Sequence, residues 1–428
     1  MTLPKVKGVR YYIAGLLMLV TMVNYIDRTC LSVAGPTLKE KLSINEQQFS
    51  YIIMCFQFSY LIMQPLFGRI MDWLNIKKGF SLAIVWWSVA NMLHAFARGP
   101  FALGIFRSLL GVGEAGNFPG VAKTAAEWFP PRERTMATGI ANIGSGTGAM
   151  IATPLVAWII LKFGWQEAFV ITGAIGIVWL VLWLLLYHSP EKHPLITVEE
   201  LAYIRQGQQE LNVEDITPEK SVWKLVLTQR NFWGIACARF LSEPAWQFFS
   251  YWIPLYLATE RGMNLKQIAY FAWVPFLAAD LGSFVGGLLS PMFQKFGLSV
   301  ITARKAAMTT AACMMPFALF IAKAPSGGWA ILWFSCAAFG HNCISATLLT
   351  LPADLFPKRT VATANGLSGS VAHFGGMLFT FTVGMLVMNL GYTPIFAIIA
   401  VLDLVGAALL WSLVRTPSTS KNHAELVP

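Results

Sequence analysis

The sequence predicts an all-α membrane protein with twelve transmembrane helices, arranged in two six-helix halves around a central cavity. Of the 428 residues, 56% are hydrophobic and only 12% are charged, with a mean hydropathy of +0.58. This composition is too apolar for a soluble domain of this length. Apolar stretches of roughly 20 residues recur from Tyr12 to Val414, and each can cross about 30 Å of hydrocarbon as a helix. Helices are expected because lipid offers no hydrogen-bond partner to an open backbone.

The polar turns between these stretches define the expected spans. We place the spans at residues 12–35, 49–69, 79–98, 100–121, 136–161, 167–188, 229–258, 267–292, 301–322, 328–350, 361–388 and 391–414. The longest polar segment divides them six and six. We therefore expect an N-terminal half over 1–188, a cytoplasmic linker over 189–228, and a C-terminal half over 229–428 that ends in a short cytoplasmic tail. The first span is expected to be retained, because no small-residue cleavage site follows it.

An internal repeat supports the division into halves. After span four, residues 127–139 read as an acid, an aromatic turn, a basic cluster and a small-residue helix start. Residues 354–364 repeat this order after span ten, and a weaker echo links residues 68–72 with 287–291. Parallel six-helix repeats of this kind are a known transporter architecture.

The basic residues indicate how the chain is oriented. With a cytoplasmic N-terminus, the cytoplasmic side holds 21 of the 31 lysines and arginines and the opposite side holds seven. This bias predicts that both termini are cytoplasmic, and it explains the net charge of +10 without nucleic acid. Three arginines remain inside expected spans: Arg28, Arg107 and Arg239.

Four charged residues in the first half form the strongest candidate site. Asp27 and Arg28 are adjacent in span one, and Arg107 and Glu114 lie seven residues apart in span four, about 10 Å along one helical face. An ionisable group in a membrane costs at least ~2.5–3.5 kcal/mol, so each needs a partner or a task. Arginine grips a carboxylate bidentately, and a carboxylate in a low-dielectric cavity can exchange a proton. The cluster predicts proton-coupled anion symport; the alternative is an Asp27–Arg107 or Arg28–Glu114 ion pair that merely joins two helices.

Weaker candidates are polar or aromatic residues inside the spans. Those that could contact substrate are Tyr60, Gln64, Ser145, Trp246, His341, Asn342, Asn365 and His373. In span seven, Arg239 and Glu243 could form an ion pair or act in function. Asp280 and Asp403 are lone carboxylates, and Asp403 is interpreted as a neutral, hydrogen-bonded core acid.

Other chemistries lack their motifs. The six cysteines show neither metal-ligand spacing nor a disulfide framework. There is no Walker A motif, hydrolytic or redox constellation, or long cationic helix. We therefore expect no enzyme, no cofactor, no metal, no primary pump and no voltage sensor.

These motifs resemble known families. Gly68-x-x-x-Asp72 followed by Lys77-Lys78 resembles the loop 2–3 signature of the major facilitator superfamily, with Asn75 where that pattern usually has glycine. The anion:cation symporter family within it resembles this chain at further motifs: Asn24-Tyr25-x-Asp27-Arg28, Arg107 with Glu114, and Glu127-Trp-Phe-Pro-x-x-Glu133-Arg134. Three segments look most like its bacterial hexuronate transporters: Arg239-Phe-Leu-Ser-Glu-Pro-Ala-Trp246, Trp252-Ile-Pro-Leu-Tyr and Ala362-Thr-Ala-Asn-Gly-Leu367.

The resemblance implies a proton symporter that works by alternating access and imports a hexuronate. Asp27 and Glu114 would be the proton-linked carboxylates, and Arg28 and Arg107 would bind the substrate carboxylate or pair with these acids. Tyr60 matches a substrate-facing position, whereas Ser145 and His373 depart from galactonate relatives and are candidates for uronate selection. Structural or gating roles are implied for a second group: Gly68, Asp72, Lys77, Lys78, Arg239 and Glu243.

The expected partners are a small anionic sugar acid, protons and the lipid bilayer. We expect a monomer in a bacterial inner membrane. The alternatives are another sugar acid or organic anion (galactonate, glucarate, tartrate), sodium coupling, or a transporter-like sensor.

Overall fold

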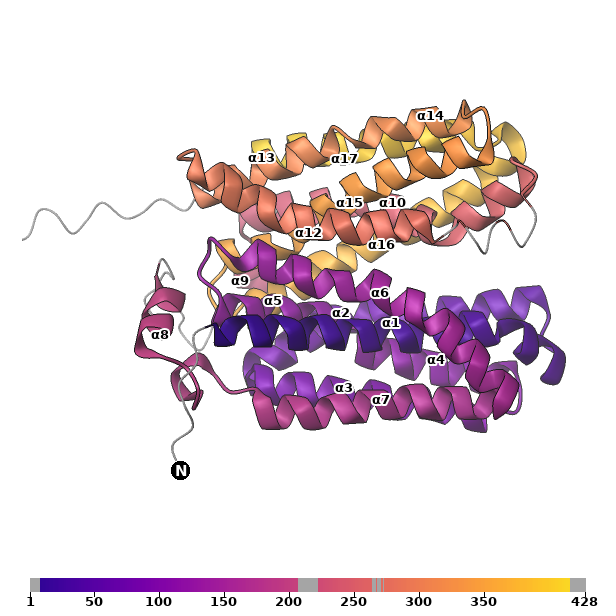
Figure 1. Cartoon of the computed structure of the whole chain (residues 1–428), viewed down its shortest axis with the longest axis horizontal. Coiled ribbons are helices and arrows are strands. Elements are labelled where there is room, and N and C mark those ends of the chain that lie inside the picture. The colour runs from indigo at the N-terminus through magenta and orange to yellow at the C-terminus, as the bar shows by residue number, and fades with distance from the viewer. Residues whose placement is uncertain (1–7, 207–221, 264–266, 268–270, 272, 416–428) are drawn as a thin grey trace, which may run out of the picture.

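The computed structural model describes residues 8–206, 222–263, 267, 271 and 273–415. Most of them lie in long helices that run along one common axis (Figure 1). The first half contains α1 (Val9–Lys41), α2 (Glu46–Leu74), α3 (Ile76–Leu93), α4 (Pro100–Glu114), α5 (Asn117–Trp128), α6 (Arg134–Lys162) and α7 (Trp165–Leu186). Between the halves lie α8 (Val198–Arg205) and α9 (Val222–Leu227). The second half contains α10 (Arg230–Thr259), α12 (Val274–Lys295), α13 (Val300–Ala312), α14 (Leu319–Ala322), α15 (Gly327–Leu355), α16 (Val361–Leu390) and α17 (Thr393–Leu413).

The expected spans correspond closely to these helices. In the described part of the chain, nine helices are long and apolar enough to cross a membrane. They coincide with expected spans one, two, three, five, six, eight, nine, ten and twelve. Helices α10 and α16, of 30 residues each, occupy expected spans seven and eleven. The predicted cytoplasmic linker lies partly outside the described residues, at 207–221, as do tail residues 416–428.

Expected span four is the exception, because two helices take its place. Helix α4 ends at Glu114 and α5 begins at Asn117, so the apolar stretch at 100–121 contains a helix break that hydropathy did not predict. Pro119 has no N–H to donate to the carbonyl four residues earlier, which interrupts the helical ladder. Gly116 adds a weak helix former at the break, where an added Cβ would lie 2.9 Å from Ala83 Cβ.

The two halves pack closely at the end of the bundle that carries the N-terminus (Figure 1). Helix α2 packs on α16, and α6 packs on α12. At Gly139 an added Cβ would lie 2.6 Å from the Ser283 carbonyl oxygen, and at Gly68 it would meet the Ala362 carbonyl. These contacts admit only glycine, as is common where membrane helices approach closely.

Charged residues join the halves at the same end. Asp354 pairs with Arg134 at 3.1 Å and with Arg304 at 3.0 Å, and all three side chains are buried. We call these residues the Asp354 cluster. Arg134 belongs to the first copy of the sequence repeat and Asp354 to the second, so the two copies contact each other. The repeat therefore marks equivalent places in the two halves.

The turn between α2 and α3 carries the predicted signature. Asp72 pairs with Lys123 at 3.0 Å and accepts a hydrogen bond from the Thr363 backbone N–H at 2.8 Å, which links it to the second half. Asn75 has φ +69°, a left-handed conformation that glycine and asparagine tolerate best. Its side chain also accepts a hydrogen bond from the Lys78 N–H at 3.2 Å and caps α3. Asparagine thus replaces the usual glycine without losing the turn.

Helix α8 is attached to the start of α1. The Glu200 carboxylate accepts hydrogen bonds from the backbone N–H groups of Gly8 (2.9 Å), Val9 (3.1 Å) and Arg10 (3.2 Å). A carboxylate at a helix N-terminus satisfies donors that have no partner within the helix. Near it, the ring of His193 meets that of Trp128 edge-on, and burial lowers the pKa of His193.

Candidate functional site

Arg28 and Glu114 form an ion pair between α1 and α4. Arg28 donates from Nε and Nη2 to Glu114 Oε2, at 3.1 and 3.0 Å. The Glu114 side chain is fully buried, whereas the Arg28 side chain is 22% exposed. The guanidinium therefore separates the buried carboxylate from open space. The pairing that the sequence offered as a structural alternative is present, and its cation remains accessible.

Aromatic rings surround the two arginines. The Arg28 guanidinium carbon lies 4.9 Å from the Tyr25 ring centroid, 5.0 Å from Phe56 and 5.1 Å from Tyr60. Phe56 also lies 4.9 Å from the guanidinium carbon of Arg107. Ring faces attract cations, most strongly where water is excluded. These contacts hold the cations in place without neutralising them.

Arg107 reaches the backbone of α1. Its Nη2 donates to the Arg28 carbonyl oxygen at 2.9 Å, and the residue is 4% exposed. Of the two predicted anion-binding arginines, Arg28 is therefore the more exposed and Arg107 the more buried.

Asp27 lies behind this pair in a polar cluster that the sequence did not predict. Its Oδ1 accepts a hydrogen bond from Asn91 Nδ2 on α3 at 2.7 Å. Asn91 Nδ2 also lies 2.7 Å from Thr172 Oγ1 on α7. All three residues have no exposed surface. In the sequence, Asn91 and Thr172 are single polar residues within two apolar spans, and this was the one sign of the cluster.

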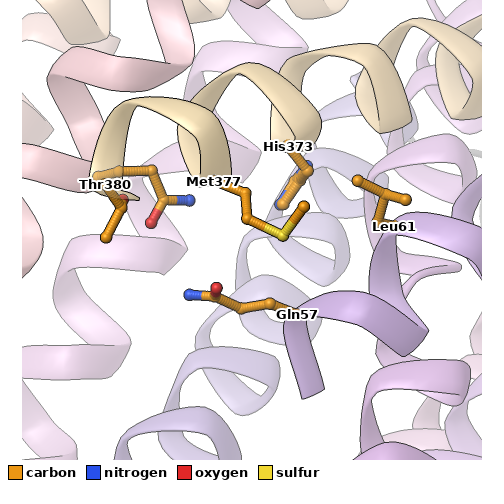
Figure 2. Close-up of a pocket in the computed structure, with 6 residues that line it drawn as sticks. Gln57, Leu61, His373, Met377 and Thr380 are labelled. Atoms are coloured by element: carbon orange, nitrogen blue, oxygen red, sulfur yellow. The ribbon is translucent and has the colours of Figure 1, made fainter. Parts of the chain in front are cut away.

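Tyr60 and His373 meet across the boundary between the halves. Their ring centroids lie 4.6 Å apart, and His373 Nδ1 is 3.0 Å from the Gly369 carbonyl oxygen. Beside them is a narrow cavity lined from α2, α10 and α16 (Figure 2). It is lined by Gln57, Leu61, Gln247, His373, Met377 and Thr380. His373 is the predicted candidate that lines this cavity.

A second, small cavity lies in the second half, between α10 and α15. It is lined by Arg239, Ser242, Glu243, His341, Ser345, Leu348 and Leu349. Trp246 stacks on His341 with ring centroids 6.1 Å apart and an interplanar angle of 11°. This cavity brings together three predicted candidates and adds the hydroxyls of Ser242 and Ser345.

Arg239 and Glu243 do not pair with each other. Arg239 Nη1 donates to the Asn365 carbonyl oxygen at 3.1 Å and to Ser368 Oγ at 2.8 Å, which ties α10 to α16. Glu243 accepts a hydrogen bond from Gln247 at 3.1 Å. The ion pair considered from the sequence is thus wrong, because each side chain has a different partner.

The remaining candidates lie in helix contacts away from the charge cluster. Ser145 donates to the Asn142 carbonyl at 2.6 Å, and Asn365 donates to the Leu349 carbonyl at 3.4 Å. Gln64 is buried where an added Cβ on Gly369 would touch it, and Asn342 is also buried. Asp403 is buried with Oδ2 3.5 Å from His341 Nδ1, in agreement with a core acid that has a partner.

No metal centre is found in the part of the chain that the structure covers. Across residues 8–206, 222–263, 267, 271 and 273–415, no three His, Cys, Asp or Glu side chains are grouped to hold an ion.

The fold and this buried charge cluster define a membrane transporter, and comparison with known proteins identifies its family. The Major Facilitator Superfamily profile matches residues 17–380 and 300–427, and the chain belongs to this superfamily. This confirms the predicted fold class and the expectation of a multi-pass transporter rather than an enzyme.

Two relatives and one solved structure are similar over most of the chain. The Hexuronate transporter of Escherichia coli (strain K12) is 41% identical over 412 residues, covering 96% of this chain and 95% of that protein. The Galacturonate transporter of Dickeya chrysanthemi is 42% identical over 312 residues, covering 73% and 90%. The proton:xylose symporter XylE, bound to 6-bromo-6-deoxy-D-glucose, aligns with a TM-score of 0.77 at 14% identity, covering 95% and 96%. At that identity the last match shows the fold alone.

Proposed function

We propose that this chain is a proton-coupled symporter that imports a hexuronate, such as galacturonate or glucuronate, by alternating access. The observation that carries the proposal is the buried Arg28–Glu114 pair, whose arginine remains accessible while its carboxylate does not. The cargo is supported by 41% identity with a hexuronate transporter over 96% of this chain.

Coupling follows from two ways of neutralising Arg28. Without substrate, Glu114 balances the guanidinium at 3.0 Å. If Glu114 takes up a proton, Arg28 becomes a cation without a counter-charge, and a substrate carboxylate can replace the lost one. Proton and anion then bind together, because either alone leaves an uncompensated charge in a low-dielectric site.

Alternating access is supported by the unequal packing of the two ends. The Asp354 cluster, the Asp72–Thr363 contact and the close approach at Gly139 hold the halves together at the N-terminal end. The cavity beside His373 lies between the halves farther along α2 and α16. We infer that this conformation is closed at the N-terminal end, and that transport requires these contacts to break.

The membrane orientation is also part of the proposal. The excess of lysine and arginine on the N-terminal side favours cytoplasmic termini in a bacterial inner membrane. The closed end would then be cytoplasmic. We further propose halves bounded at 1–188 and 229–428, and a protein that functions as a monomer.

The test is uptake into proteoliposomes with an imposed pH gradient. Labelled galacturonate should accumulate when the outside is acidic, with sodium absent. Glu114→Gln should abolish accumulation but retain exchange of labelled for unlabelled galacturonate. Glu167→Gln, which alters an exposed glutamate at the start of α7, is the matched control and should behave as wild type. Accumulation that survives Glu114→Gln, or that needs sodium, would contradict the coupling.

A competition panel tests the cargo. Unlabelled galacturonate and glucuronate should inhibit labelled uptake more strongly than galactonate, glucarate or tartrate at equal concentration. If one of the latter competes best, the transport mechanism stands and the substrate assignment changes. Substrate binding without any flux would instead favour a sensor.

A further inference from the structure

Asn91 and Thr172 form a polar cluster around Asp27 that lies outside both cavities. They come from α3 and α7, whereas the charge cluster is built from α1 and α4. Asn91 and Thr172 have no exposed surface, and neither lines a described cavity. Burying an amide between two apolar helices costs free energy unless the amide is hydrogen-bonded.

The hydrogen bonds around Asn91 have a definite direction. Thr172 Oγ1 lies 3.4 Å from the Phe169 carbonyl and also interacts with the Asp27 carboxylate, and both of these accept, so its hydroxyl donates to one of them. Its lone pairs are then free to accept one N–H of Asn91, at 2.7 Å. The other N–H of Asn91 is directed to Asp27 Oδ1, also at 2.7 Å. Asn91 Nδ2 also lies 3.3 Å from the Phe169 carbonyl oxygen, which can only accept, so Thr172 and Phe169 together place the amide nitrogen, and Asn91 is a donor to Asp27.

This direction constrains where Asp27 can hold a proton. Oδ1 faces an N–H, so a proton on Oδ1 would oppose a donor. Oδ2 is buried without a hydrogen-bond partner among the described residues. Protonation at Oδ2 keeps the Asn91 hydrogen bond intact.

We propose that Asn91, held by Thr172, is the positioning residue for Asp27: it directs protonation to Oδ2 and sets the pH at which Asp27 exchanges its proton. The inference rests on the proposed proton coupling. Other charges act on the same carboxylate: Glu114 and Arg107 face it from α4, and Arg28 and Cys30 are its neighbours on α1. Those groups remain in every variant below, and Asn91→Ala also keeps the Thr172 hydroxyl, which interacts with Asp27 directly, so that variant isolates the effect of the amide.

The proposal predicts a shift in pH dependence when the donor is lost. A hydrogen bond to a carboxylate favours its charged form, so its removal should move protonation to higher pH by about one unit. The direct measurement is labelling of purified protein by a hydrophobic carbodiimide, which reacts with protonated carboxyls. The labelled Asp27 peptide is quantified by mass spectrometry from pH 5 to 10, and no substrate is needed.

Paired variants separate positioning from general packing. Asn91→Ala and the isosteric Thr172→Val should both shift the labelling midpoint upward, whereas Thr172→Ser keeps the hydroxyl and should match wild type. Asn117→Ala removes another buried amide of the first half, which bonds to Thr21, and should leave the midpoint unchanged. If Asn91→Ala does not fold, the nearly isosteric Asn91→Leu takes its place.

Uptake measured in parallel distinguishes the two proposals. A wild-type labelling midpoint in both Asn91→Ala and Thr172→Val overturns the positioning role, even where proton-driven galacturonate uptake is intact. If Asn91→Ala is not folded, a wild-type labelling midpoint in both Asn91→Leu and Thr172→Val overturns the positioning role. Wild-type protein that labels at Asp27 but shows no proton-driven uptake contradicts the proposed function instead. If both proposals hold, the pH at which uptake falls on the alkaline side should shift together with the labelling midpoint.

Discussion

The Asp354 cluster offers a quantitative test of how the closed end is held. Asp354 accepts from two buried arginines, Arg134 at 3.1 Å and Arg304 at 3.0 Å. Asp354→Asn keeps the shape and removes the charge, so both guanidinium groups lose their counter-charge. Removing one partner of a buried pair costs about 3–5 kcal/mol.

The structure favours the lower end of that range. Arg134 keeps its hydrogen bond to the Ala353 carbonyl, and Arg304 keeps those to Ser290 Oγ and the Pro131 carbonyl. Of the two pairs, Arg134–Asp354 crosses between the halves, whereas Arg304 and Asp354 belong to the same half. A loss of about 3 kcal/mol on the crossing pair, confined to the conformation in which this end is closed, shifts the equilibrium toward opening by roughly a hundredfold.

Cysteine accessibility measures that shift. Thr350 is fully buried at the contact with Thr138 of the first half, so Thr350→Cys reports opening at this end. In a background without the six native cysteines, Asp354→Asn should raise the maleimide labelling rate of this site by roughly a hundredfold. Glu191→Gln is the control, because its pair with Arg205 is 3.7 Å long and about half exposed, and should change nothing. A rate within twofold of the parent in Asp354→Asn would refute the idea that these charges hold the end closed.

Three further predictions concern other parts of the chain. Glu200→Ala removes the acceptor shared by three backbone N–H groups at the start of α1, so trypsin should cut after Arg205 at least tenfold faster; an unchanged rate would mean that Glu200 does not attach α8. Because burial lowers the pKa of His193, the contact between the α8 segment and the start of α1 should be most stable above the unfolded pKa of histidine and weaken as pH falls from about 7.5 to 5.5. Trypsin cleavage after Arg205 should therefore become faster as pH falls, and His193→Gln should remove this pH dependence. Glu243→Gln removes a carboxylate from the wall of the second cavity, so galactarate should inhibit galacturonate uptake about tenfold better; equal inhibition would show that Glu243 does not repel a second substrate carboxylate.

Hydropathy predicted the helices well because each segment in lipid must satisfy its own backbone hydrogen bonds, so an apolar stretch of sufficient length is enough to indicate a helix. The helix break within span four, which hydropathy did not predict, also has a local cause. Pro119 and Gly116 interrupt the ladder between α4 and α5, but the stretch around them stays apolar, so a window average passes over the break. The sequence contained this information in the proline position rather than in its hydropathy.

Pairing within the charge cluster could not be predicted in the same way. Two cations and two carboxylates on spans one and four allow either Arg28–Glu114 or Asp27–Arg107, and the choice depends on how α1 and α4 are rotated against each other. The structure pairs Arg28 with Glu114 and gives Asp27 an amide partner. Asn91 was missed because a single polar residue has no periodicity.

Arg239 illustrates a second limit. Its nearest acid in sequence is Glu243, one turn away, which suggested an ion pair. The acceptors that it uses are the Asn365 carbonyl and the Ser368 hydroxyl on α16, 126 and 129 positions away. Backbone carbonyls are present at every residue, so no sequence pattern marks the one that a buried arginine will contact.

The distribution of charge suggests that the two halves divide the work unequally. The repeat places equivalent basic and acidic motifs at one end of both halves, but the buried Arg28–Glu114 pair and Asp27 belong to the first half alone. In the second half, the cavity wall offers hydroxyls, His341 and one Arg–Glu couple whose members have other partners. A uronate has one carboxylate and several hydroxyls. Its carboxylate would suit the charged residues of the first half, and its hydroxyls would suit the polar residues that line the cavity of the second half. Substitutions around Arg28 should therefore alter coupling for every sugar acid equally, whereas substitutions around His341 should alter the order in which sugar acids compete.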